Sequence, residues 1–406
     1  MTPTAENPGL RFFLFAYWHD VRFKNSVGGP VKVYELATNL TKRGHRVFLF
    51  IPKIGYPEQQ TTAHVCPVPF IDLPVLRFIS FQVLAFLWAL RVALRKNPPD
   101  IIYVRIMWSF IPMILGKLFS IPVLLEVNDS PHRAYSNIQH SLKRKIVYLI
   151  DRISYRFSNY VLPVTFKIAE DLHRIDSLSW DYMTVLPSGT NTDLFRPMDK
   201  SSCCKKLKFD PQKKYVGFIG TFFHHQGIDV LIDSSPLIIQ QRSDVSFLLV
   251  GDGQMRTKWE RKVNEMGLKN YFIFTGNVPY EDVPYYCGIM NVCVSPLLEE
   301  AGERSPVKVF DYLACAKPVV MSDVAETGKI FEDSGAVRLI PTEDEVSLSQ
   351  SILQLLEDDH LRAKMGKKGR EFVESRYSRM KIAEMVETIA SKLNQEKGVV
   401  IRNLTV

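Results

Sequence analysis

Short apolar runs alternate along the chain with longer segments in which apolar residues recur at helical spacing. The runs are typical of strands buried on both faces of a parallel sheet, and the longer segments are typical of helices that cover such a sheet. We predict strands at residues 11–15, 46–51, 101–104, 122–127, 160–163, 215–220, 246–250, 271–274, 291–294, 318–321 and 337–340. The pattern therefore predicts an α/β protein built from two successive Rossmann-like units.

The intervening segments predict helices. In residues 31–43, for example, one apolar face is formed by Val33, Leu36, Ala37 and Leu40. We predict further helices at residues 78–94, 108–119, 143–156 and 228–240, and helices through most of residues 344–395. The polar and charged residues 199–212 separate the two series, so we predict the interdomain linker there.

Two of these segments allow a second interpretation. Residues 78–94 are the most apolar part of the chain, but Gln82 and Arg91 interrupt them and they are short for a membrane span. We favour a helix that faces the core over a membrane anchor. Residues 143–156 form a basic amphipathic helix, whose charged face is either simply solvated or in contact with a membrane interface.

Length and charge narrow the range of functions. With 406 residues, of which 46% are hydrophobic and 23% charged, the chain is long enough for two domains with substantial cores. The net charge of +8 favours anionic partners such as phosphates or acidic lipid surfaces. Nucleic acid is not an expected partner, since we find no zinc-finger spacing, RNA-binding aromatic signature or helix-turn-helix pattern.

The six cysteines have neither metal-binding nor disulfide-framework spacing, so reduced thiols of a cytosolic protein are the simplest interpretation. No paired aspartates indicate a metal site. Residues 1–9 are polar and lack the apolar core of a signal peptide. We therefore expect a cytoplasmic protein.

One stretch, residues 295–312, combines several features of an anion-binding site. It follows a predicted buried strand and opens a helix, for which Ser305 is a suitable N-cap and Pro306 a suitable first residue. Arg304 and Lys308 lie at this helix start, where the helix dipole disfavours cations and the two like charges repel each other. An anion bound at the exposed N–H groups would turn both penalties into attraction.

Two carboxylates, Glu303 and Asp311, flank these cations. Carboxylates accept hydrogen bonds from sugar hydroxyls, and cations with free amides bind phosphate, so the combination indicates a nucleotide-sugar site. The alternative is an ordinary surface helix start in which Lys308 and Asp311 form an ion pair.

Glycines follow several predicted strands. Gly220, Gly251 and Gly276 end three strands of the second unit, which suggests one rim where backbone lies close to a ligand. In the first unit, Gly28-Gly29 precede a helix, and the polar residues 128–133 follow a strand. The paired glycines either let the backbone approach a ligand closely or simply form a strand–helix turn. Because the GxGxxG motif is absent, a dinucleotide site is not favoured.

With these residues in view, nearly the whole chain resembles glycosyltransferase family 4, a large retaining family with the GT-B fold, in which two Rossmann-like domains face a central cleft. The resemblance rests on the order and spacing of Gly28-Gly29 and of residues 186–195, 248–253, 274–279, 303–311 and 312–320. It implies an N-terminal acceptor-binding domain at residues 1–196 and a C-terminal nucleotide-sugar-binding domain at residues 197–376. A C-terminal helix within residues 377–406 is expected to pack back on the N-terminal domain.

The resemblance also implies roles for individual residues. The family's pair of glutamates falls on Glu303 and Asp311, and a subset of the family has a run similar to Arg304-Ser305-Pro306-Val307-Lys308. The expected catalytic residues are Glu303, Arg304 and Lys308; the expected donor-binding residues are Gly220, Thr221, Gly251, Gly253, Gly276, Val278, Ser305, Pro306, Val307 and Asp311; the expected acceptor-side residues are Gly28, Gly29, Asn128, Asp129 and His132. We expect no metal ligands, and no cofactor besides the nucleoside-diphosphate sugar as co-substrate.

Several positions depart from the family pattern. Asp311 is one methylene shorter than the usual glutamate. Thr221 and Gln226 replace an arginine and a lysine, so the cations at the start of the 305–312 helix would take over diphosphate neutralisation. Asn128 replaces a histidine. Ala316 replaces a helix-capping glycine, and a left-handed non-glycine residue costs about 1 kcal/mol there.

The sequence thus predicts a retaining, metal-independent glycosyltransferase of the hexosyltransferase type. Its donor is a nucleoside-diphosphate sugar and its acceptor a glycan, lipid-linked glycan or lipid in cell-surface polysaccharide or glycolipid biosynthesis. A non-catalytic nucleotide-sugar-binding scaffold that has lost turnover is the alternative, and a sugar-nucleotide 2-epimerase fits the motifs less well. We expect peripheral association with an anionic membrane at its cytoplasmic, inner face.

Overall fold

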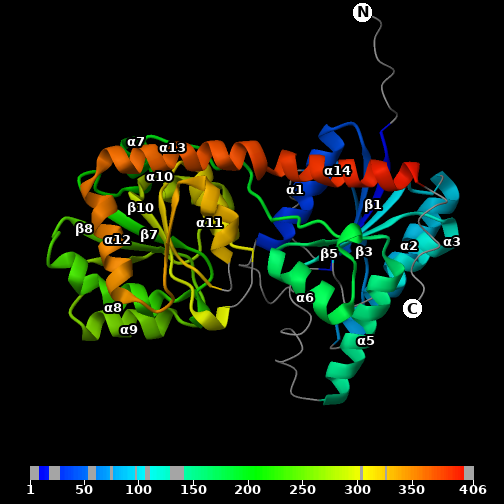
Figure 1. Ribbon diagram of the computed structural model, residues 1–406, viewed down its shortest axis with the longest axis horizontal. Helices are drawn as coiled ribbons and strands as arrows, with labels where there is room; N and C mark the ends of the chain where they lie inside the picture. The colour runs from blue at the N-terminus through cyan, green and yellow to red at the C-terminus, as the bar shows by residue number, and fades with distance from the viewer. Residues whose placement is uncertain are drawn as a thin grey trace, which may run out of the picture. The chain divides into compact units, whose positions relative to one another are not determined.

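The computed structural model describes residues 9–17, 28–53, 61–73, 76–96, 98–105, 110–128, 141–301, 305–324 and 327–396. The chain forms two compact units, residues 1–187 with residues 379–406 (unit 1) and residues 188–378 (unit 2). In the described part of the chain, each unit contains a six-stranded sheet, all of whose strand pairs are parallel (Figure 1). The predicted α/β architecture is confirmed.

The sheet of unit 1 has the strand order β3-β2-β1-β4-β5-β6. Its strands are β1 (Arg11–Phe15), β2 (Arg46–Pro52), β3 (His64–Val68), β4 (Ile101–Arg105), β5 (Val123–Val127) and β6 (Tyr160–Pro163). The central strand β1 pairs with β2 on one side and β4 on the other, so successive connections leave it in opposite directions. Ligands of open α/β sheets bind at the carboxyl ends of strands beside such a point.

Helices cover both faces of this sheet. They are α1 (Gly28–Lys42), α2 (Leu76–Lys96), α3 (Ile114–Phe119), α5 (Ser141–Phe157), α6 (Phe166–Asp176) and α14 (Arg379–Gln395). Side chains alternate along β1, so Phe12 and Leu14 pack with α1 and α14, whereas Phe13 and Phe15 pack with α2, α3, α5 and α6. The C-terminal helix α14 thus completes the core of unit 1 beside α1 (Figure 1).

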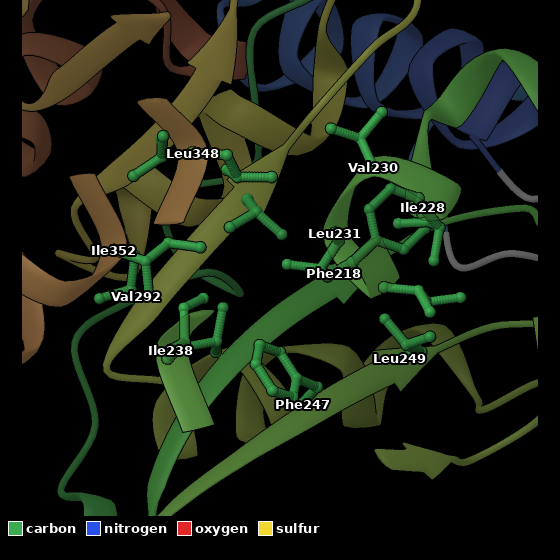
Figure 2. Packing of buried hydrophobic residues seen from close by; sticks show 14 of the residues in the cluster. Phe218, Ile228, Val230, Leu231, Ile238, Phe247, Leu249, Val292, Leu348 and Ile352 are labelled. Atoms are coloured by element: carbon green, nitrogen blue, oxygen red, sulfur yellow. The ribbon is translucent and has the colours of Figure 1, made fainter. Parts of the chain in front are cut away.

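The sheet of unit 2 has the order β12-β11-β10-β7-β8-β9. Its strands are β7 (Lys214–Ile219), β8 (Val245–Val250), β9 (Phe272–Phe274), β10 (Val292–Ser295), β11 (Val319–Ser322) and β12 (Val337–Ile340). Its helices are α7 (Lys200–Leu207), α8 (Ile228–Ile239), α9 (Arg256–Glu265), α10 (Val283–Ile289), α11 (Val307–Ala314), α12 (Glu345–Glu357) and α13 (Asp359–Arg376). One face packs against α8, α9 and α12, where Phe218, Phe247 and Ile352 are buried (Figure 2). The other face packs against α7, α10, α11 and α13.

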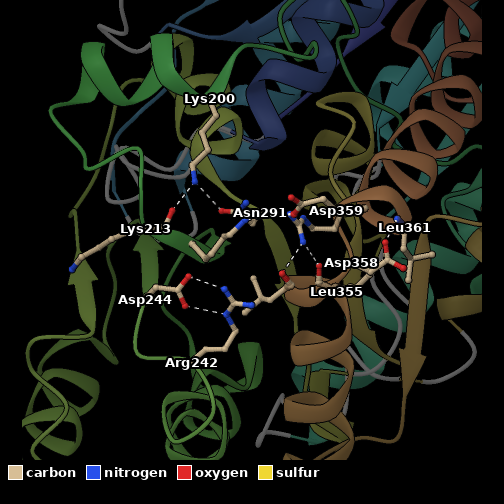
Figure 3. A network of polar contacts seen from close by, with 12 residues as sticks. Lys200, Lys213, Arg242, Asp244, Asn291, Leu355, Asp358, Asp359 and Leu361 are labelled. Carbon is tan, nitrogen blue, oxygen red and sulfur yellow. Dashed lines mark hydrogen bonds and ion pairs between the residues drawn. The ribbon is translucent and has the colours of Figure 1, made fainter.

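Polar contacts tie together the amino ends of the unit 2 strands (Figure 3). The ammonium of Lys200 donates to the carbonyl of Lys213 at 2.6 Å and to Oδ1 of Asn291 at 3.2 Å. Arg242 forms a two-pronged ion pair with Asp244 just before β8. These groups lie at the edge of the sheet opposite to the carboxyl ends, so they stabilise the fold without occupying the expected ligand edge.

The predicted linker at residues 199–212 is wrong. Most of it is helix α7, because Cys203 and Cys204 are buried among the side chains of the unit 2 core, and Leu207 packs beside them. The units part in sequence after Pro187 and after Ser378, whereas the sequence placed the boundaries after residues 196 and 376. Residues 188–195 belong to unit 2 because their backbone and side chains bond and pack within it, as Phe195 does in its core.

Candidate functional site

The candidate donor site lies at the carboxyl ends of β7, β8 and β9, where three glycines join neighbouring loops. Gly220, Gly251 and Gly276 have φ of +152°, +133° and +74°, a region that side chains rarely adopt. The amide of Gly251 donates to the carbonyl of Gly276 at 3.1 Å, and a Cβ added to Gly251 would lie 2.0 Å from the oxygen of Gly220. The close packing of these loops is therefore by itself a sufficient reason for a glycine at position 251, without any ligand.

Lys308, in the first turn of α11, reaches back to this rim. Its ammonium donates a hydrogen bond to Oε1 of Gln226 and lies 4.0 Å from the centre of the Phe218 ring. A Cβ added to Gly220 would lie 3.3 Å from the same nitrogen. The predicted catalytic cation and the predicted glycine turn are thus neighbours.

Desolvation of the ammonium lowers the pKa of Lys308 to about 7, although the side chain as a whole is partly exposed. Among the described residues no carboxylate compensates for this cost, and the ion pair with Asp311 considered from the sequence is not formed. An anion beside the nitrogen would favour the charged form. Lys308 is therefore placed so that the binding of an anion beside its nitrogen would increase the fraction of the side chain that is protonated.

The loop that carries Gln226 is held in place by a second loop. The amide of Leu298 donates to the carbonyl of His225 at 3.1 Å, and Nδ1 of His224 lies 2.7 Å from Oε1 of Glu300. Nε2 of Gln226 lies 3.1 Å from Nε2 of His225. Gln226 occupies the position of a family lysine, and here its amide oxygen accepts from the lysine of α11 instead.

Asp311, the predicted ribose-binding carboxylate, accepts a hydrogen bond from the hydroxyl of Thr190. Thr190 is buried, and its amide donates to the carbonyl of Tyr377 at 2.9 Å. The amide of Ser188 donates to Oγ of Ser305 at 3.3 Å. The segment at residues 188–191 therefore packs against the predicted donor site, which the sequence signalled only through the family motif.

The start of α11 differs from the prediction. The helix begins at Val307, Pro306 is its cap with ψ of +67°, and among the described residues no side chain caps it. Ser305 therefore does not act as the N-cap; its hydroxyl is used by Ser188 instead. Glu303 and Arg304 lie outside the described residues.

The other predicted donor residues also line these loops. Gly253 has φ of +159°, and a Cβ there would lie 2.6 Å from the carbonyl oxygen of Phe222, so loop packing again requires glycine. The carbonyl of Thr221 accepts from the amide of Phe223 at 2.9 Å. Val278 is partly buried against the unit 2 core and presents no polar side chain.

The predicted acceptor residues fall on unit 1. Gly28 and Gly29 are the first residues of α1. Asn128 follows β5, and its Oδ1 accepts from Nη2 of Arg105 at 3.3 Å. Asp129 and His132 lie outside the described residues.

The sequence alone did not predict a buried charged network that lies beside Asn128. Nζ of Lys32 donates to Oε1 of Glu126 at 2.7 Å, the hydroxyl of Tyr103 donates to Oε2 of Glu126, and Nε of Arg105 lies 3.7 Å from Oε1. All four residues are at least nine-tenths buried. A single carboxylate inside the apolar run of β5 was the signal that could have revealed a buried partner.

The network fixes the charges of its members. Burial lowers the pKa of Lys32 to about 8, against the attraction of Glu126. Burial alone would raise the pKa of Glu126, but the charges of Lys32 and Arg105 and the hydrogen bonds from Lys32 and Tyr103 bring it to about 2. Glu126 is therefore a carboxylate at neutral pH, and the network ties the amino-terminal part of α1 to the carboxyl ends of β4 and β5.

Two family models match the chain. Residues 28–194 match the one described as Glycosyltransferase Family 4, and residues 213–358 match the one described as Glycosyl transferases group 1. A GDP-mannose-dependent monoacylated alpha-(1-6)-phosphatidylinositol monomannoside mannosyltransferase from Corynebacterium glutamicum is 26% identical over 200 residues, 48% of this chain and 52% of that protein. The alignment thus spans about half the length of that relative.

Solved structures match over nearly the whole chain. Sucrose-phosphate synthase from Thermosynechococcus elongatus has a TM-score of 0.75 at 19% identity, covering 95% of this chain and 99% of that one. HepE from Anabaena, in complex with UDP, has a TM-score of 0.71 at 16% identity, covering 94% and 100%. At these identities the likeness shows a shared fold.

Proposed function

This chain is a glycosyltransferase of family 4 with the GT-B fold, and from that premise we propose that it transfers a sugar from a nucleoside-diphosphate sugar with retention of anomeric configuration. The observation that carries the proposal is the position of Lys308. Its ammonium lies between Gly220, Phe218 and Gln226, at the start of α11 and at the carboxyl ends of the unit 2 strands. A diphosphate placed there meets both a cation and the amino-terminal end of α11.

The electrostatics suit departure of a nucleoside diphosphate. Breaking the bond between sugar and diphosphate leaves negative charge on the phosphate oxygens, and fixed positive groups stabilise that charge most in the transition state. Lys308 and the α11 amides supply this stabilisation, with Arg304 expected beside them. Glu303 is proposed to hold sugar hydroxyls and Asp311 the ribose, with the Thr190 hydroxyl orienting the Asp311 carboxylate.

We propose a reaction of the hexosyltransferase type without a divalent metal. The solved HepE complex contains UDP, which makes uridine nucleotides the first donors to test, and the Corynebacterium relative is named for GDP-mannose. Activity that survives saturating chelator would support metal independence, and loss that Mg²⁺ restores would refute it.

We propose that unit 1 holds the acceptor, a glycan, lipid-linked glycan or lipid of cell-surface polysaccharide or glycolipid biosynthesis. Gly28, Gly29 and Asn128 lie near its carboxyl-end switch point, with Asp129 and His132 expected there. The Corynebacterium relative is named for a phosphatidylinositol mannoside acceptor, which favours a lipid-borne one. We further propose that the enzyme is cytoplasmic and that such an acceptor brings it to the inner face of a membrane as a peripheral protein.

The test is a panel of UDP-, GDP- and ADP-sugars offered to the wild type, Lys308→Ala and the control Lys258→Ala. Lys258 is exposed on α9 and is not among the residues placed at the site. We expect one donor class to be bound and slowly hydrolysed by the wild type and the control, and binding weakened about 10- to 150-fold in Lys308→Ala, the loss of a charge-assisted contact. Equal affinity in all three proteins would contradict the proposal, and product anomer analysis decides retention.

A non-catalytic nucleotide-sugar-binding scaffold is the second candidate. The observation in its favour is the hydrogen bond from Thr190 to Asp311, which already uses Oδ1 of the carboxylate expected at the ribose. Saturable donor binding without hydrolysis or transfer to any acceptor would support the scaffold.

A further inference from the structure

The helices α2, α3 and α5 cover one face of the unit 1 sheet and form a continuous layer. The short helix at Ile111–Met113 packs against α2 and leads directly into α3, and α3 packs against α5. The ammonium of Lys117 on α3 lies 5.7 Å from the centre of the Phe157 ring on α5. We call the outer side of this layer the α2–α3–α5 surface.

This surface is unusually apolar. Along α2, the exposed positions recur at helical spacing and carry Ile79, Val83, Leu87 and Leu94, of which Leu87 is 50% and Leu94 69% exposed. Large side chains on α3 and α5 continue it, namely Leu118, Ile146 and Leu149 at 61%, 49% and 59% exposed. Several large apolar side chains exposed on packed neighbouring helices are typical of an interaction site.

The helix α2 is also, in the described part of the chain, the helix that is long and apolar enough to cross a membrane. Only 28% of its most apolar 18-residue window is buried. Its inner face, with Phe81, Ala85 and Ala89, packs on the sheet. A spanning α2 would have to leave the sheet and expose that core, so its packing argues against α2 crossing a membrane. The sequence interpretation of this helix as core-facing therefore holds for one face only.

Nearly all of the charge on these three helices is basic, and Arg77 at the start of α2 pairs with Asp72, which precedes that helix. The helix α2 carries four basic residues, α3 one and α5 five, and the single acidic residue among them, Asp151, is 1% exposed. Their net charge of +9 exceeds the +8 of the whole chain, so the remaining residues together are close to neutral. The positive charge noted in the sequence is thus concentrated on the three helices that carry the exposed apolar side chains.

We propose that the α2–α3–α5 surface docks on an anionic lipid bilayer, with the apolar side chains inserted at the interface and the basic ones among the headgroups. Apolar residues interleaved with Lys and Arg, with the one acidic side chain of the three helices buried, are what such an interface requires. A second copy of the chain is disfavoured, because pairing two like surfaces would bring two charges of +9 together. The proposal rests on the proposed function in one respect only: docking would serve to bring the transferase to a lipid-borne acceptor.

The test is sedimentation of the full-length protein with vesicles, in the absence of donor and acceptor. Vesicles of phosphatidylcholine with about one third phosphatidylglycerol are compared with pure phosphatidylcholine at low and at high salt. We expect binding to the anionic vesicles that weakens at high salt, where the Debye length falls to about 3 Å at 1 M. Because neither substrate is present, failure here does not decide sugar transfer, and failure of donor binding does not decide docking.

Paired variants separate the two contributions. Arg152→Gln with Arg156→Gln on α5 should weaken binding about 25-fold, since each basic residue near an anionic bilayer contributes about fivefold. Leu87→Gln with Leu94→Gln on α2 should weaken binding at both salt concentrations.

Matched exposed pairs in unit 2 serve as controls. Lys258→Gln with Arg261→Gln controls for charge, and Leu237→Gln with Val346→Gln controls for apolar side chains. We expect both to bind as the wild type does. Equal losses in test and control pairs would show that docking does not use this surface and would overturn the proposal.

Trp88 provides a direct readout of contact, because it lies on α2 and is 38% exposed. Lipids brominated near the headgroup should quench wild-type fluorescence more than that of Trp88→Phe. Three outcomes would overturn the proposal: protein that stays in the supernatant with anionic vesicles at low salt, equal quenching in both proteins, or self-association in solution that the α2 pair abolishes.

Discussion

At the scale of single residues, the chemistry of the unit 2 site depends on whether Lys308 carries a proton. With a pKa of about 7, part of the population has a neutral amine at neutral pH. A bound diphosphate raises that pKa, so above pH 7 binding must take up a proton. We expect donor affinity to fall by about tenfold per pH unit above 7, until the pKa of the bound state is reached.

Calorimetry in two buffers of different ionisation enthalpy measures that proton uptake directly.

The unfolding free energy of the free protein should rise with pH, whereas its donor affinity falls. Because the folded pKa lies below the ordinary 10.5, the unfolded chain binds more protons between pH 7 and 10.5, and this contribution to stability grows as pH rises. Lys308→Met should flatten the affinity profile. A slope that persists in Lys308→Met would assign the proton to another group.

Ala316 offers a test of backbone strain. It follows α11 with φ of +56°, the left-handed conformation expected from the missing glycine. We predict that Ala316→Gly raises the free energy of unfolding by about 0.5–1 kcal/mol, because relief of the strain exceeds the added freedom of the unfolded chain. Urea unfolding measures the change. The control Ala314→Gly, inside α11 and buried, should instead destabilise; a loss of stability in both variants would contradict the explanation.

At the scale of elements, the sequence predicted the strands that are almost entirely apolar, such as Val245–Val250, predicted at residues 246–250, because burial on both faces imposes that pattern. It missed β3, an edge strand whose His64, Cys66 and Pro67 break the pattern and whose outer edge needs no pairing. The linker prediction failed because composition alone does not reveal that two cysteines face the core.

Contacts between distant residues were beyond such reasoning. Lys32 and Glu126 are 94 residues apart, and Thr190 and Asp311 are 121 apart. Hydrophobic periodicity places each residue on an element, but only the order of strands in the sheet decides which elements meet. The unusual position of Lys308 could be predicted, because the helix start and the like charge of Arg304 that disfavour a cation there are close to it in sequence. Its partner Gln226 could not be predicted.

The buried network makes a prediction about how α1 is held to β5. Glu126→Gln leaves the charges of Lys32 and Arg105 without a buried counter-ion, which should cost about 3–5 kcal/mol of unfolding free energy. Glu387→Gln is the control, since its pair with Arg43 is partly exposed and should contribute at most about 1 kcal/mol.

Denaturant unfolding of unit 1 measures both variants. Lys32→Met combined with Glu126→Leu should recover part of the loss, because it removes both charges of the pair and fills a similar volume. Equal effects of Glu126→Gln and Glu387→Gln would show that the network does not hold these elements together.

At the scale of the whole molecule, the two units differ in how the chain builds them. Unit 2 is one continuous segment, whereas unit 1 needs residues from both ends, residues 1–187 and 379–406. The helix α14 contributes Ile382, Val386 and Leu393 to the unit 1 core, each at most 6% exposed. Its first residue, Arg379, is also buried and pairs with Glu35 of α1 at 2.7 Å.

This asymmetry predicts the outcome of truncation. A chain that ends at residue 378 loses α14, and the three apolar side chains alone represent about 5–9 kcal/mol of burial, as much as the whole stability of many domains. We expect unit 1 to unfold while the fragment 188–378 still melts cooperatively by calorimetry. Adding a peptide of residues 379–396 in excess should restore the transition of unit 1, because it supplies the missing face. If the truncated chain keeps both transitions, α14 is an accessory to the unit 1 core, and if the 188–378 fragment does not fold alone, unit 2 is not an independent folding unit.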